Sequence, residues 1–125
     1  MSGIVGTSHS KSKVIGSSKD TAKAWVNFDG TTKVGGNCTI RDSFNVSTVT
    51  DNGTGDYTVN FATSMPNTDY CVVGLPRNQG SGVRGASTLG IYHTSGQATG
   101  WVRLLSQYPD NGDYYDNSTM CIAIF

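Results

Sequence analysis

The chain has 125 residues, only 14% of them charged, and nine Lys and Arg residues balance nine Asp residues to a formal net charge of zero. This balance argues against a broad basic surface for nucleic acid or an anionic membrane, and no apolar run approaches the roughly 20 residues that span a bilayer. We therefore expect neither a nucleic-acid nor a membrane partner. The first 16 residues lack an apolar stretch of signal-peptide length, so we expect assembly in a cytoplasm.

The composition favours strands over helices. Glu is absent and Leu is scarce, although both are good helix formers, whereas 16 Gly residues and many Ser, Thr and Asn residues supply turns and polar strand faces. The length fits one domain. The cysteines Cys38, Cys71 and Cys121 form no close pair of the kind that binds a metal, so we interpret them as buried free thiols and expect no cofactor.

Residues 1–23 differ from the rest of the chain. Two short apolar pairs, Ile4-Val5 and Val14-Ile15, lie among Ser, Gly, Thr and Lys residues with no amphipathic period. One interpretation is a disordered tail. The other, which we carry forward, is an extended N-terminal anchoring arm that docks Ile4, Val5, Val14 and Ile15 onto a neighbouring subunit.

The first predicted strand, residues 24–28, alternates, with Val26 and Phe28 on one face. Turn signals follow at Asp29-Gly30 and Gly35-Gly36. The sequence therefore predicts a short strand that stops at Asp29.

A long strand is predicted over residues 38–50. Its inward face holds Cys38, Ile40, Phe44 and Val46. The apolar phase then slips by one position, which predicts a bulge or bend near residues 47–48. The motif DNGTG at residues 51–55 is a hairpin signal. The return strand points three side chains inward, namely Tyr57, Val59 and Phe61.

The second half continues the strand-and-loop pattern. Residues 70–75 are apolar on both faces and predict a central strand, and residues 76–87 predict a Gly-rich loop. Further strands are predicted at residues 88–93, 98–106 and 119–125, separated by a turn at 94–96 and a polar loop at 107–118. Seven or eight short strands at this spacing predict an all-β, antiparallel β-sandwich over residues 24–125, with a jelly-roll-like variant as the alternative.

Catalytic patterns are missing from the sequence. There are two histidines, no G-x-S-x-G nucleophile motif and no Glu for paired-carboxylate hydrolysis, so we do not expect an enzyme. The loop YPDNGDYYDNS has three interpretations: a solvated turn, a calcium loop, and a contact surface for sugars or another protein. The candidate contact residues are Tyr108, Asp110, Asp113, Tyr114 and Tyr115.

A longer pattern covers residues 24–74, in the runs AWVNFDGT and TIRDSFNVSTVTDNGTGDYTVNFATSMPNTDYCVVG. It resembles a module of tailed-bacteriophage structural proteins that are often labelled tail fibre proteins. In that module, an A-W-V-N-F strand precedes an I-R-x-S-F-N-V-S strand, a D-N-G-T-G-x-Y-x-V-N-F hairpin and an M-P-x-x-x-Y strand. This chain departs from the module by inserting residues 33–37 between the first two strands.

The resemblance implies a component of the virion that assembles with copies of itself, commonly as a trimer, and with other virion proteins. A tail-fibre-like protein could also contact a host surface glycan. Two alternatives stay open: a capsid decoration (cement) protein on the phage head, and a free carbohydrate-binding module.

Overall fold

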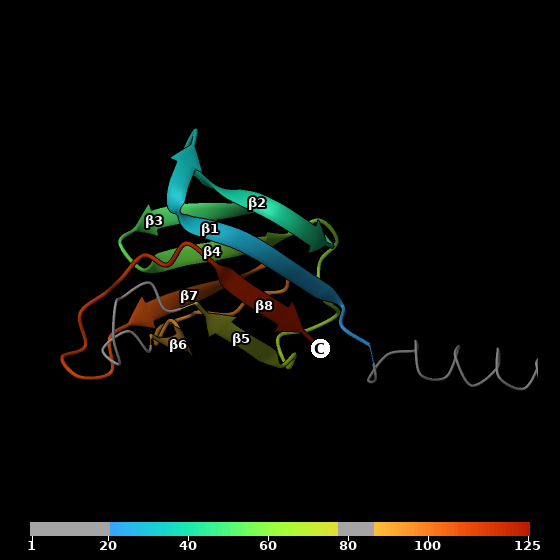
Figure 1. Ribbon diagram of the computed structural model, residues 1–125. Coiled ribbons are helices and arrows are strands. Elements are labelled where there is room, and N and C mark those ends of the chain that lie inside the picture. Colours follow the sequence, from blue (N-terminus) through green and yellow to red (C-terminus); the bar gives the residue numbers. More distant parts are fainter. Residues whose placement is uncertain (1–20, 78–86) are drawn as a thin grey trace, which may run out of the picture.

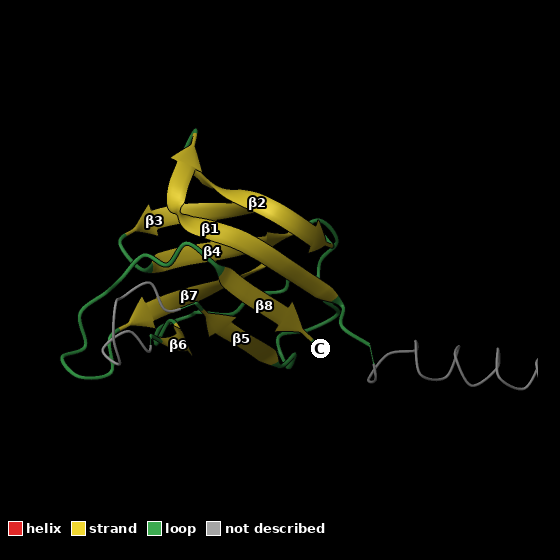
Figure 2. Cartoon of the chain, in the orientation of Figure 1, coloured by secondary structure: helices red, strands yellow, loops and turns green. Residues whose placement is uncertain are grey.

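The computed structural model describes residues 21–77 and 87–125, which form eight strands and no helix (Figures 1 and 2). The all-β, antiparallel expectation is confirmed. No helix among these residues could cross a membrane. The strands are β1 (Ala24–Val34), β2 (Asn37–Phe44), β3 (Val46–Gly53), β4 (Asp56–Phe61), β5 (Val72–Pro76), β6 (Thr88–Ile91), β7 (Trp101–Gln107) and β8 (Met120–Ile124).

All eight strands belong to one antiparallel sheet with the order β5-β8-β1-β2-β3-β4-β7-β6. The sheet curls until its two edge strands, β5 and β6, come side by side (Figure 1). At Gly74 of β5, a Cβ atom would lie only 2.7 Å from Cδ2 of Leu89 in β6. The architecture is therefore a nearly closed, barrel-like sheet, and a division into two separate sheets is not confirmed.

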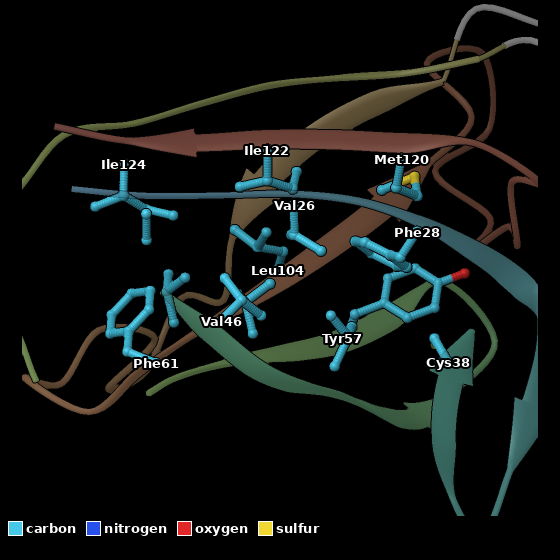
Figure 3. Packing of buried hydrophobic residues seen from close by; sticks show 14 of the residues in the cluster. Val26, Phe28, Cys38, Val46, Tyr57, Phe61, Leu104, Met120, Ile122 and Ile124 are labelled. Carbon is cyan, nitrogen blue, oxygen red and sulfur yellow. The ribbon is translucent and has the colours of Figure 1, made fainter. Parts of the chain in front are cut away.

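The core fills the inside of this sheet. Alternate residues of β1, β4, β7 and β8 point inward and are buried, as the period-two pattern predicted. Phe28 of β1 meets Tyr57 of β4 edge-on, with ring centroids 5.3 Å apart (Figure 3). The residues of these four strands with at most 1% exposure are Ala24, Val26, Phe28, Tyr57, Val59, Val102, Leu104, Ser106, Met120 and Ile124.

The predicted long strand over residues 38–50 is wrong, because the chain reverses at Asn45. Asn45 has a φ of 53°, a left-handed conformation that Asn tolerates better than most residues. Its side-chain oxygen accepts a hydrogen bond from the Thr63 N–H (2.7 Å), and its amide donates to the Lys23 carbonyl (3.0 Å). Phe44, expected inside, is consequently 54% exposed. The predicted irregularity near residues 47–48 is confirmed, since the β3–β4 register shifts between Val46 and Thr48.

The predicted turn at Asp29-Gly30 is also wrong, since β1 continues through both residues to Val34. Gly30 is needed for a close approach rather than a turn: a Cβ there would lie 2.7 Å from Cζ of Tyr57. The turns at Gly35-Gly36 and at the DNGTG hairpin are confirmed, with positive φ at Gly35, Gly36, Gly53 and Gly55.

Residues 70–75 do not form a central strand. They contribute to β5, which lies at one edge of the sheet and pairs only with β8. Inward-facing Gly74 and Val72 are partly covered, whereas Val73 is 52% and Leu75 77% exposed. The apolar character on both faces of β5 therefore reflects an exposed apolar surface instead of burial on both sides.

Candidate functional site

The Tyr-rich loop between β7 and β8 has a firmly held base. Oδ1 of Asp116 accepts hydrogen bonds from the Tyr57 hydroxyl and the Gly55 N–H, both at 2.7 Å. Asn117 is fully buried; its amide donates to Oγ of Ser106 at 2.7 Å. Each of these contacts joins the loop to a strand or hairpin of the domain. The loop therefore leaves the sheet from a fixed position.

The tip of this loop is a compact turn exposed to solvent. The Tyr108 N–H donates to the Asp113 carbonyl, and the Gly112 N–H donates to the Tyr108 carbonyl, each at 2.9 Å. The Asn111 amide holds the Asp113 carboxylate at 2.7 Å. Gly112 has a φ of 75°, which a glycine adopts without strain.

Two of the five candidate contact residues bring their side chains together. The rings of Tyr108 and Tyr115 lie 4.5 Å apart, whereas Asp110, Asp113 and Tyr114 are exposed. The loop thus pairs two of the aromatic rings and leaves the other three side chains exposed to solvent. Sequence reasoning missed Asp116 and Asn117, which position the loop, because nothing in the run D-N-S distinguishes a buried anchor from a solvated turn.

Metal binding has no support among residues 21–77 and 87–125, where no group of three or more His, Cys, Asp or Glu side chains could hold an ion. The geometry of the described residues therefore does not support the interpretation of this loop as a calcium site. The expectation of three buried thiols is correct for Cys38 and wrong for Cys71 and Cys121, which are exposed. Burial, reinforced by the nearby carboxylate of Asp51, raises the pKa of the Cys38 thiol to about 12.

The outer surface of the sheet is polar over β3, β4 and β7. The Asn60 amide donates to the hydroxyl oxygens of Thr48 and Thr50, both at 3.0 Å. Arg103 forms a two-pronged ion pair with Asp56, at 2.8 and 2.6 Å, and its guanidinium lies 4.0 Å from the centre of the Tyr92 ring. These groups satisfy one another, as polar groups on a solvated sheet face do.

The outer surface is largely apolar over β8, β5 and the Trp25 end of β1. A trough of about 510 Å³ lies there, between Trp25 on one side and Val73 and Leu75 on the other. Cys121 and Ala123 lie between these two walls. Trp25 is 36% exposed, a large fraction for a Trp on a strand. We call this feature the apolar trough. It was not predicted, because the sequence pattern placed β5 inside the sheet.

The predicted contact residues of the arm, Ile4, Val5, Val14 and Ile15, lie outside the described residues. No family model, curated protein or solved structure matches the chain. The phage-like assignment therefore stays a prediction from the sequence motifs.

Proposed function

We propose that the chain is a non-enzymatic structural protein of a bacteriophage virion, tail-fibre-like in character. It assembles in the host cytoplasm through its N-terminal arm and β-domain, with copies of itself as a homotrimer and with other virion proteins. The observation that carries the proposal is the apolar trough over β1, β8 and β5. The resemblance of residues 24–74 to phage structural modules is the reason for proposing that the assembly is a virion.

The contrast between the two halves of the outer surface supports assembly. Polar side chains over β3, β4 and β7 are paired with one another, whereas Trp25, Val73 and Leu75 have large exposed fractions. Removing apolar surface from water contributes roughly 25 cal/mol per Å². A contiguous apolar patch on one face typically marks a protein–protein contact. The absence of net charge gives isolated copies little mutual repulsion.

We also propose that the sheet packs as two layers in a jelly-roll-like manner. Phe28 of β1 and Tyr57 of β4 meet across a single core, although their strands are not neighbours in the sheet. This contact across one core supports the interpretation of the nearly closed sheet as two opposed layers. Such layers would suit a compact virion module.

Incorporation into particles tests the proposed function. The full-length chain and a variant lacking residues 1–20 would be supplied during phage assembly, and purified particles would be probed for each. We expect the full-length chain in particles and the shortened chain at a much lower level. Absence of the full-length chain from particles would contradict the proposal. Copy number separates tail from head: hundreds of copies indicate a capsid decoration protein, and a few to some dozens indicate the tail.

A second candidate function, host glycan binding, is favoured by the loop geometry. Asp116 and Asn117 hold the base of the loop, while the Tyr114 side chain is 49% exposed. Tyr offers a rigid apolar face with a polar end, and an Asp carboxylate accepts hydrogen bonds from sugar hydroxyls. A glycan array with the intact protein tests this candidate, with Tyr114→Ala and Asp110→Ala as variants. Binding that survives both substitutions would place the glycan elsewhere.

A further inference from the structure

The strand register explains how side-chain sizes on β1, β8 and β5 form the apolar trough. Across β1, β8 and β5, the outward-facing rows are Trp25–Ala123–Val73 and Asn27–Cys121–Leu75. The middle strand thus carries the two smallest side chains, while larger ones stand on both neighbours. Neighbouring strands are about 4.8 Å apart, so the flanking rows are separated by about 10 Å. That width admits one extended chain carrying aliphatic side chains.

Phe125 directly follows β8, which ends at Ile124. It is 41% exposed, and its backbone exchanges two hydrogen bonds with Cys71, at 2.9 and 3.0 Å. This pairing fixes the C-terminal residue beside the start of β5. The trough is lined by residues of β1, β5 and β8. Its lining holds no charged side chain.

Resting on the proposed function, we propose that the apolar trough of one copy binds residues 1–20 of a second copy. The pairs Ile4-Val5 and Val14-Ile15 are the apolar side chains of that segment suited to the trough, and glycines flank them at positions 3, 6 and 16. Glycine lets a backbone approach a sheet face closely. Strands β5 and β8 have five residues each, or about 17 Å, so about five extended residues span the trough, with one side chain of an aliphatic pair facing it and the other facing away.

The direction of the chain at the start of β1 favours another copy over the same copy. The Lys23 N–H donates to the Ile124 carbonyl at 2.7 Å, so residue 23 continues the line of β1 past the end of β8. This direction leads away from the copy's own trough. Twenty extended residues reach about 66 Å, which is long enough for either trough, so the direction of the chain at Lys23 is what favours a neighbouring copy.

Cysteine trapping in the full chain tests this docking, because Cys121 is an exposed thiol in the trough. The background is Cys71→Ser, which removes the other exposed thiol. Val5→Cys and Ile15→Cys place thiols in the two aliphatic pairs, and Ser10→Cys places one between them as the matched control. Isotope-labelled and unlabelled chains are mixed, oxidised with diamide, and the cross-linked peptides are identified by mass spectrometry.

We expect Val5→Cys or Ile15→Cys to link to Cys121 of a differently labelled chain at least about ten-fold more than Ser10→Cys does. Adding Ala123→Arg should fill the trough and lower that yield at least about ten-fold, with the unfolding midpoint measured to confirm that the domain is folded. Links within one chain, links between two Cys121 residues, or yields equal to the Ser10→Cys control would each overturn the proposal.

The outcomes of the particle test and the trapping test are independent of each other. If the full-length chain enters particles but no link to Cys121 forms, the docking is wrong and the virion role stands. If the link forms but the chain is absent from particles, the docking stands and the virion role is wrong.

Discussion

The hydroxyl of Tyr57 on β4 donates a hydrogen bond of 2.7 Å to Oδ1 of Asp116, far along the chain in the Tyr-rich loop. The Tyr57 side chain is fully buried, and its ring also supports Phe28 across the core. Burial, followed by the hydrogen bond to Asp116, raises the pKa of the Tyr57 hydroxyl, which therefore stays a donor throughout the ordinary pH range. A single contact thus couples the position of the candidate contact loop to the packing of the core.

Replacing Tyr57 with Phe should lower the free energy of unfolding by about 1.5–3 kcal/mol, because the hydrogen bond has a charged acceptor that stays partly buried. Chemical denaturation followed by fluorescence measures the change. Tyr114→Phe is the matched control: Tyr114 is exposed, so its free energy of unfolding should move by no more than about 0.5 kcal/mol. Equal effects of the two substitutions would contradict the anchoring role of Tyr57.

Gly30→Ala should destabilise the domain by about 1–3 kcal/mol, as overpacking does. The added Cβ would lie 2.7 Å from Cζ of Tyr57 and 2.8 Å from the carbonyl oxygen of Asn117, and both residues are fully buried. Gly90→Ala is the control, since a Cβ there has no neighbour within 4 Å and no positive φ is needed. Thermal unfolding of both variants measures the difference, and a Gly30→Ala variant as stable as Gly90→Ala would refute the close approach.

The cysteines should fall into two reactivity classes. At about pH 8, the Cys38 thiol, with its pKa raised to about 12 by burial, is almost entirely protonated and is shielded from reagents. Cys71 and Cys121 are exposed. Iodoacetamide should therefore modify only these two residues in the native protein and all three in denaturant, as read by peptide mass mapping. Rapid native alkylation of Cys38 would show that the core is open around β2.

Alternation made much of the fold predictable. Where one face of a strand is buried and the other solvated, inward residues recur at every second position, as Val26 and Phe28 do in β1 and as Tyr57 and Val59 do in β4. The DNGTG hairpin was predictable for a related reason, because its glycines adopt conformations that other residues avoid. Such signals are local, so a single sequence carries them.

Long-range relationships were not predictable in this way. Asn45 reverses the chain without a Gly or Pro, and its conformation depends on Lys23 and Thr63, which are distant in sequence. The outward side chains of β5 look like core residues in sequence, because an apolar surface that faces solvent and one that faces a core use the same residue types. Asp116 likewise becomes an anchor only once β4 lies beside it.

The ion pair between Asp56 and Arg103 should make stability depend on pH. The hydrogen bonds from Arg103 hold the pKa of the Asp56 carboxyl below its ordinary value, against the opposing effect of burial. A carboxyl with a lowered folded-state pKa contributes stability that is fully present above the unfolded-state pKa, about 3.9, and is lost as pH falls through the lower folded-state value. Urea unfolding from pH 7 to pH 2 should therefore show this contribution fading below about pH 4.

Asp56→Asn removes the titrating group, so the variant should lose about 1 kcal/mol at pH 7 and should converge toward the wild type in acid. Arg103→Met keeps the aliphatic stem but removes the charge that lowers the carboxyl pKa, and the double variant completes a thermodynamic cycle. The coupling energy between the two positions should be favourable at pH 7 and fall toward zero near pH 2, because a protonated Asp56 no longer attracts the guanidinium. A coupling energy that is constant over this range would mean that shape and packing, rather than charge, join β4 to β7 here.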